Sequence, residues 1–550
     1  MNGPFSMPGL NHAVWMVVIG GPLLAAAALA VPKLRRFVLW LAPWTAAPAV
    51  LVALFGPHGE QSTFDAFLLG ARFAADPVAR VFLLFTGLLW LIAGLYATSY
   101  LRDDPRKVRF FAFFLAAMAG NLGLEAAQDM PSFYALFALM TFASYGLVLH
   151  TGSNEARRAS LIYIVMAVLG EAALFAAMIT LTSATNTMVF AEVNFAEVEP
   201  ASRNLAMVLA MIGLGVKAGV IGIHMWLPLA HPAAPTPASA VLSGAMIKAG
   251  VIGWIRFLPV GQLDLPEAGT VVIVLGLTSA VAAVLFGISQ TNPKTVLAYS
   301  SVSQMGLITI ALGLGLRNAD LWPAAMGAVL LYALHHSLAK GALFLGVGVA
   351  AAMPSASGPR ALVRIGLLVP ALALAGVPLT SGSVAKTALK GVAEAASTGW
   401  AGALEILLPL TAVGTTVIMS RFLFLVWRPK EDRGHQLPPK MMLTWAALVV
   451  LSGVAIWIWP SWLNASIVSK ALEFPKMWAL VWPVLVGGTL TVLVVRSPYL
   501  RRRFGEPVVP AGDLLVPLVS LGEAVLSVAK GMVERVQRTA EPFFAKVRSN

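Results

Sequence analysis

Long apolar runs constrain this chain more than any other feature of its sequence. Stretches of about 20 residues with few charges recur along it, for example at 79–99, 159–182, 269–289 and 477–495, and a helix needs that length to cross roughly 30 Å of hydrocarbon. Hydrophobic residues make up 58% of the 550 residues and charged residues 11%. A soluble domain carries about 25% charged residues. The sequence therefore predicts an all-α polytopic membrane protein.

The apolar runs predict about 14–15 transmembrane helices. Their approximate ranges are 13–32, 37–55, 79–100, 108–127, 131–150, 158–183, 203–226, 237–258, 269–290, 294–316, 324–350, 361–396 (broken), 401–427, 441–460 and 477–496. The first run lacks a basic leader, so we expect a retained helix rather than a cleaved signal peptide.

The charged loops predict the orientation of the chain. Basic residues fill the loops after the first, third, fifth, eleventh, thirteenth and fifteenth runs, whereas the intervening loops are neutral or acidic. Short cytoplasmic loops carry an excess of Lys and Arg. We therefore expect a bacterial inner-membrane protein with a periplasmic N-terminus and a cytoplasmic C-terminus. This distribution also accounts for the net charge of +13 without a nucleic-acid partner.

The chain contains no cysteine. Disulfides, thiolate-bound iron–sulfur clusters and Cys-ligated zinc are thereby excluded. We expect no cofactor, no metal site and no catalytic chemistry of the chain's own. Any electron transfer would take place on a partner.

Several ionisable residues lie inside the predicted spans. They are Lys217, Lys248, Lys340 and Lys386, then His224, His335 and His336, then Glu125, Glu171 and Glu405. Such a residue costs about 2.5–3.5 kcal/mol at bilayer depth and usually carries function. Burial disfavours an ammonium and a nearby carboxylate restores it, while histidine titrates near neutrality. The set predicts a proton path. For each lysine, and for Glu405 near a span end, the alternative is a side chain that reaches the helix end.

Two of the predicted helices are interrupted. The span at 203–226 runs into Pro228 and the proline-rich stretch 231–237, and the span at 361–396 carries Gly376–Gly382 at its middle. Paired interruptions indicate a transport path built from inverted repeats. We therefore divide the chain into N-terminal helices (1–105), a first five-helix repeat (106–258), a second (259–430), C-terminal helices (431–500) and a cytoplasmic tail (501–550).

The tail has its own pattern at 513–540. Leu518, Leu521, Val525 and Val528 recur at helical spacing, with charged residues between them. This pattern predicts an amphipathic helix that lies on the membrane surface or on a partner.

Four motifs resemble those of the antiporter-like membrane subunits. They are Gly215-Val216-Lys217 with His224–Pro228 and Pro235–Ala240, then Leu297–Gly306, then His336–Lys340, then Gly376-Val377-Pro378 with Lys386. The family comprises the large membrane subunits of respiratory complex I, Mrp cation/proton antiporters, membrane-bound hydrogenases and the membrane partner of inorganic-carbon uptake complexes. The order of the motifs matches from about residue 75 to 430.

The resemblance implies roles for individual residues. Lys217 resembles the central lysine on broken helix seven, and Lys248 resembles a bridging lysine on helix eight. His336 and Lys340 resemble the linking pair on helix eleven. Lys386 resembles the terminal lysine on broken helix twelve, through which the proton is thought to leave.

One departure from the family affects the first half of the path. The family has a glutamate on helix five, six residues before Ser-Tyr, and the same count from Ser144-Tyr145 leads to Ala138. Glu171 or Glu125 replaces this acid, or the first half-channel is altered. We favour Glu171 because it lies near mid-membrane, whereas Glu125 lies near the outer end of its span, where water competes for it.

Three functions remain open on these residues. The first is a proton-translocating subunit that moves H+, or H+ against Na+, with small membrane subunits or a soluble cytoplasmic subunit as partners. The second is the membrane subunit of a CO2/bicarbonate uptake complex, where proton influx energises a zinc-containing partner. The third is a membrane scaffold that does not conduct, for which Ala138 is the main argument.

Overall fold

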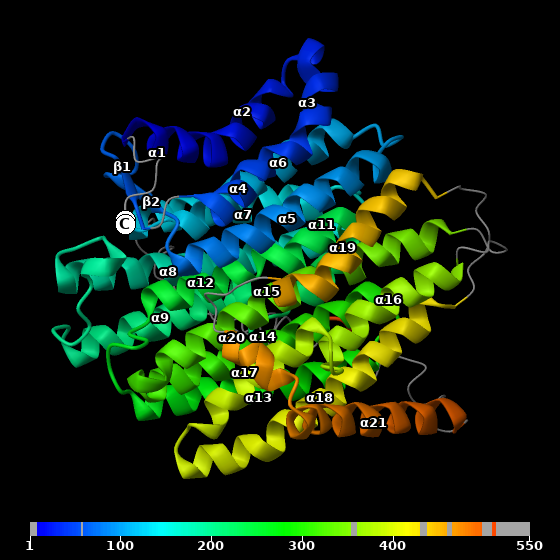
Figure 1. Cartoon of the computed structure of the whole chain (residues 1–550). Coiled ribbons are helices and arrows are strands. Elements are labelled where there is room, and N and C mark those ends of the chain that lie inside the picture. The colour runs from blue at the N-terminus through cyan, green and yellow to red at the C-terminus, as the bar shows by residue number, and fades with distance from the viewer. Residues whose placement is uncertain are drawn as a thin grey trace, which may run out of the picture.

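The computed structural model describes residues 8–56, 59–353, 360–428, 437–458, 465–497 and 509–512, and Figure 1 shows long helices packed side by side in one bundle. Within these residues, 13 helical segments are long and apolar enough to cross a membrane. A shorter apolar helix at His12–Ala28 and the interrupted pair α16 (Arg360–Ala375) and α17 (Ser381–Glu394) account for the remaining predicted spans. The predicted all-α polytopic fold is confirmed.

Prolines divide the N-terminal region into short segments. These are α1 (Pro8–Trp15), the π-helical turn η1 (Met16–Gly20), α2 (Gly21–Ala28), η2 (Pro32–Leu34), α3 (Arg35–Leu41), η3 (Ala42–Ala46) and α4 (Ala47–Phe55). Pro32, Pro43 and Pro48 each stand in the first turn of a segment, where a missing N–H costs no hydrogen bond. The antiparallel hairpin of β1 (Gln61–Phe64) and β2 (Ala71–Ala74) follows, and then α5 (Pro77–Tyr100).

Two sets of helices occupy the regions predicted to hold the repeats. The first set is α6 (Lys107–Ala126), α7 (Met130–Val148), α8 (Asn154–Thr185), η4 (Phe190–Glu192), α9 (Pro200–Ala218), α10 (Trp226–Ala233), α11 (Thr236–Val241), η5 (Leu242–Met246) and α12 (Lys248–Phe257). The second is α13 (Pro266–Ile288), α14 (Pro293–Arg317), η6 (Ala319–Leu321), α15 (Trp322–Ala352), α16, α17 and α18 (Thr398–Val426). Helix α6 packs on α7 as α13 packs on α14. The division into inverted repeats stays a prediction.

The C-terminal region adds α19 (Pro439–Ile458), α20 (Ala465–Ala471) and α21 (Phe474–Arg496). Helix α21 lies at the edge of the bundle (Figure 1) and packs mainly on α18. Residues 509–512 return to the bundle, where the Val509 carbonyl accepts from Gln290 Nε2 at 2.9 Å. The predicted amphipathic helix at 513–540 lies outside the described residues.

Loop contacts separate the two ends of the bundle. At one end Arg72 pairs with Glu192 at 3.3 Å, and Phe195 donates to Gln262. At the other end His150 lies 3.0 Å from Asp104. These loops follow even-numbered and odd-numbered predicted spans, respectively, so the contacts agree with the predicted alternation. The end that holds Glu192 is called the outer end below. Which end faces the periplasm stays a prediction.

The centre of the bundle is formed by α14 and α15, whose most apolar stretches are completely buried. Glycines let α13 approach α14 closely. A Cβ added at Gly276 would lie 2.7 Å from the Gly306 carbonyl oxygen, and one at Gly313 would lie 2.9 Å from that of Gly269. Such close backbone contact is a common way to pack helices in a membrane.

Both predicted helix interruptions are present. Helix α16 ends at Ala375 and α17 begins at Ser381, which is where the sequence places the break. The first break was predicted too late, because α9 ends at Ala218 rather than near 226. Gly219 and Gly222 adopt φ of +79° and +90°, a conformation that favours glycine, so glycine and not proline ends this helix.

Candidate functional site

Lys217 lies at the end of α9, immediately before the first interruption, and its side chain is buried. Its ammonium donates to the hydroxyl of Thr141 on α7 at 3.1 Å and to that of Tyr163 on α8 at 3.0 Å. The ring centre of Phe137 lies 5.7 Å away. A small cavity opens beside the lysine, between α7, α8 and α9. Neutral oxygens and an aromatic face therefore solvate this ammonium.

Glu171 is the carboxylate whose charge acts on Lys217. It stands on α8, two turns after Tyr163 and on the same face, and it is 4% exposed. Its Oε1 has no hydrogen-bond partner among the described residues. Thr141, which bonds the Lys217 ammonium, also lies near the Glu171 side chain. The acid, the hydroxyl and the amine thus form one polar group across α7, α8 and α9.

Glu125 belongs to a different cluster, and the prediction that water competes for it is wrong. Its Oε1 accepts from Thr86 of α5 at 2.7 Å and from Asn121 at 3.2 Å, and its exposed fraction is zero. The hairpin closes this end of α6, because Phe73 of β2 forms a bridge with Ala127. The hairpin that packs over this end of α6, rather than the position of Glu125 along the span, excludes water from its carboxylate.

Lys248 is bound by a carbonyl that a π-helical turn releases. In an α-helix the Ser243 carbonyl would accept from the N–H four residues later, but the Ile247 N–H bonds to Leu242 instead. The freed Ser243 carbonyl accepts from the Lys248 ammonium at 2.7 Å. Such π-turns occur frequently at functional sites. The Lys248 side chain has no exposed surface.

Lys340 and two histidines surround Lys248. The Lys340 ammonium donates to the Leu297 carbonyl at 2.8 Å, and His336 stands one turn before it on α15. The ring of His231 stacks on Phe344 with centres 4.5 Å apart. The ring nitrogens of His336 and His231 have no partner among the described residues, and both rings lie in the field of Lys248 and Lys340. We call Lys248, Lys340, His231 and His336 the central cluster.

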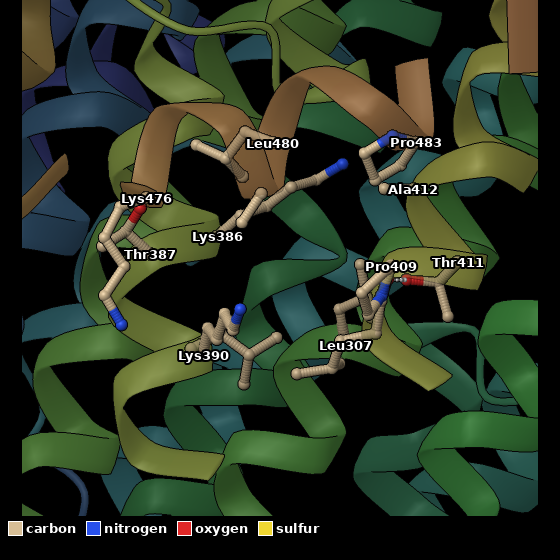
Figure 2. Close-up of a pocket in the computed structure, with 13 residues that line it drawn as sticks. Leu307, Lys386, Thr387, Lys390, Pro409, Thr411, Ala412, Lys476, Leu480 and Pro483 are labelled. Carbon is tan, nitrogen blue, oxygen red and sulfur yellow. Dashed lines mark hydrogen bonds between the residues drawn. The ribbon is translucent and has the colours of Figure 1, made fainter. Parts of the chain in front are cut away.

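Lys386 lies on α17 just after the second interruption, and its side chain reaches back across it. Its ammonium donates to the Ala375 carbonyl at 2.6 Å, which is the last residue of α16, where the negative end of the helix dipole favours a cation. His335 Nδ1 lies 2.8 Å from the Ser381 hydroxyl at the start of α17. Figure 2 shows Lys386 beside a cavity that Lys390 and Lys476 also line.

Two remaining predicted residues differ in their surroundings. His224 lies inside the first interruption and is buried, with its ring centre 6.0 Å from that of Tyr299. Glu405 is exposed on α18. Its position fits the alternative of a polar side chain near a helix end.

Sequence reasoning missed Lys294. This residue begins α14, and its ammonium donates to the Ala234 carbonyl at 2.7 Å and to the Ser239 hydroxyl at 3.2 Å. Its charge acts on His231. Because Lys294 lies in the first turn of a predicted span, the sequence favoured a solvent-facing lysine at the helix end. The signal that could have found it is the adjacent motif that begins at Leu297.

The structure brings most of the predicted residues together in three places, and it adds His231, which was not a predicted site residue. Glu171 and Lys217 lie in the first set of helices, the central cluster lies between the sets, and His335 with Lys386 lies at the second interruption. His335 lies in the field of both Lys248 and Lys386, so the last two places are electrostatically connected. No direct contact between Lys217 and the central cluster is present among the described residues.

The matching family model decides the family. Residues 127–408, more than half of the chain, match the model described as NADH:quinone oxidoreductase/Mrp antiporter, transmembrane. The chain belongs to this family. The matched region of this antiporter-like subunit includes both interruptions and all four buried lysines.

Relatives and solved structures agree with this assignment. The antiporter-like chain is 29% identical over 315 residues to hydrogenase-4 component B of Escherichia coli K12, covering 55% of this chain and 45% of that protein. It is 28% identical over 516 residues to NADH-quinone oxidoreductase subunit N of Desulforudis audaxviator, covering 85% of this chain and 99% of that protein. The chain spans about half the length of several curated relatives. A chain in the Mrp complex of Dietzia sp. DQ12-45-1b shares the fold, with a TM-score of 0.78, 24% identity, and coverage of 93% of this chain and 60% of that one.

Proposed function

We propose that this chain translocates protons as an antiporter-like subunit of a multi-subunit membrane complex. The observation that carries the proposal is that neutral oxygens hold all four buried ammonium groups. They are those of Thr141 and Tyr163 for Lys217, Ser243 for Lys248, Leu297 for Lys340, and Ala375 for Lys386. A buried lysine whose amine is held by neutral oxygens rather than by a direct ion pair can gain and lose a proton as its neighbours move.

The path begins at Glu171 and Lys217, continues through the central cluster and leaves through Lys386. Water and hydroxyls bridge the distance between Lys217 and Lys248. Lys294 is a second access point to the central cluster, because the residue as a whole is partly exposed and its charge acts on His231. The transported ion is H+.

The assembly and the location follow from the same reasoning. The relatives are named as a component and as a subunit, which supports partner subunits for this chain. We propose that these partners are other membrane subunits or a soluble subunit on the cytoplasmic side. The basic loops support a bacterial inner membrane with the N-terminus in the periplasm. The outer end of the bundle then faces the periplasm.

Proton flux through the assembled complex tests the proposal. Membrane vesicles that contain the complex are given an imposed potential, and a pH-sensitive dye reports the flux. Lys386→Ala should lower the flux about tenfold, less than a typical loss of a proton-transfer group, because the cavity beside Lys386 offers water a partial bypass. A wild-type flux equal to that of vesicles without the complex would refute the proposal and favour the scaffold.

Gly376→Ala should disturb Lys386 without removing it. An added Cβ would lie 2.6 Å from Lys386 Cδ and 3.0 Å from its Nζ, and Gly376 has φ of +88°. We expect the amine to leave the Ala375 carbonyl and the flux to fall severalfold, with strain of about 1 kcal/mol lowering the melting temperature. Gly391→Ala is the matched control on α17, because no atom lies within 4 Å of its added Cβ. Equal flux in both variants would contradict this role of Gly376.

A further inference from the structure

A cavity with about 50 Å³ of water-accessible volume lies between α17, α18 and α21, next to the last lysine of the path. Its polar lining comes from Lys386, Thr387, Lys390, Thr411 and Lys476, and the rest of the lining is apolar (Figure 2). Since a water molecule needs roughly 10–15 Å³ of such volume, the cavity has room for a few. It lies toward the outer end, because α17 ends and α21 begins there.

One face of α17 leads from the buried lysine to the surface. Lys386, Lys390 and Glu394 are spaced four residues apart, so they lie on one face over about 12 Å of helix axis. Lys386 is 9% exposed, and the side chains of Lys390 and Glu394 are 27% and 46% exposed. A proton that leaves Lys386 along this face meets one carboxylate, that of Glu394.

The start of α21 closes this route. The Lys476 ammonium binds both oxygens of Glu394 at 2.9 Å, and Lys390 lies 3.9 Å from one of them. Most of α21 faces away from the bundle, since only Pro483 and Gly487 are buried among its described residues. The ion pair therefore ties the start of an edge helix over the cavity.

We propose that Glu394 is the release group that takes the proton from Lys386 to the outer solution, and that Lys476 covers it between transfers. The inference rests on the proposed function. The Lys386 ammonium gives its proton to cavity water, which passes it to the Glu394 carboxylate once the Lys476 ammonium withdraws. The Glu394 acid then protonates outside water and returns to the carboxylate. Lys386 remains as a neutral amine until the central cluster protonates it again.

A simple anchoring role for the ion pair makes a different prediction. If the pair only holds α21 in place, removal of either partner should have the same effect. If Glu394 carries the proton, its removal should be harmful and removal of the Lys476 charge should not be. Two variants of similar shape, Glu394→Gln and Lys476→Gln, separate these cases.

The experiment measures flux in vesicles that contain the assembled complex, normalised to the amount of the chain in the membrane. Glu394→Gln should lower the flux about tenfold, less than the typical loss of a proton-transfer group, because cavity water offers a partial bypass, and Lys476→Gln should match or exceed wild type. Glu192→Gln is the matched control, because it removes a comparably exposed ion pair, with Arg72, at the same end. Its flux should equal that of wild type.

The outcomes separate this inference from the function on which it rests. Equal losses in Glu394→Gln and Lys476→Gln, or wild-type flux in Glu394→Gln, would overturn the release role while the path itself stands. A wild-type flux no higher than that of Lys217→Ala would overturn both. If Glu394→Gln does not accumulate in the membrane, Glu394→Asp keeps the acid and should retain most of the flux. A complete loss there would also overturn the release role.

Discussion

Lys217→Ala is expected to reduce proton flux to background, a loss of at least about a hundredfold, as for removal of an obligatory proton carrier. No other basic side chain contacts Thr141 and Tyr163 among the described residues, so nothing in the first set of helices replaces the lost amine. The flux assay on vesicles that contain the assembled complex measures this loss. The amount of the chain in the membrane should not change, because a buried cation is removed and not added.

Two further variants make this prediction specific. Lys33→Ala removes an exposed lysine from the short segment η2 and should leave the flux unchanged. Lys217→Arg keeps a cation and its donors, but arginine does not release its proton in proteins. It should therefore conduct as poorly as Lys217→Ala. Wild-type flux in Lys217→Arg would mean that the charge only stabilises the helices, and wild-type flux in Lys217→Ala would refute the path.

Features that depend on local chemistry could be predicted from the sequence. The span count follows from hydropathy, and the break between α16 and α17 follows from Gly376 and its neighbouring proline. The four lysines stood out because a charge at bilayer depth needs a reason. The position of the first break was wrong because prolines drew attention away from Gly219 and Gly222, whose positive φ is a property of the folded backbone.

Features that depend on distant residues could not be predicted. Glu125 is dry because a hairpin some fifty residues earlier in the chain covers its helix end. The Ser243 carbonyl is free to bind Lys248 only because of a π-helical turn, and no pattern in the sequence predicts that turn. The pair of Glu394 and Lys476 joins residues 82 positions apart. Each of these contacts is set by tertiary packing, on which hydropathy and turn chemistry give no information.

Glu171 carries the second large prediction. Glu171→Gln should lower the flux about tenfold or more, because a buried lysine holds a proton only where a carboxylate or comparable group offsets desolvation. Its charge is the one that acts on Lys217, and Thr141 bonds the Lys217 amine and lies near the acid. Glutamine has nearly the same shape, so packing between α7 and α8 should persist and the melting temperature should stay within a few degrees of wild type.

A second substitution tests whether position 138 can supply the same acid. Ala138 precedes Thr141 by three residues on α7, so its side chain lies one turn from the hydroxyl that binds Lys217. Ala138→Glu in the Glu171→Gln background should therefore recover part of the flux. Ala138→Gln in that background is the matched control, since it adds the same bulk without an acid, and it should recover nothing. We expect only partial recovery, because Ala138 is partly exposed. More polar surroundings weaken the attraction between an acid at this position and the Lys217 amine. Normal flux in Glu171→Gln alone would place the acid elsewhere, and equal recovery by glutamate and glutamine would show that position 138 acts through packing rather than charge.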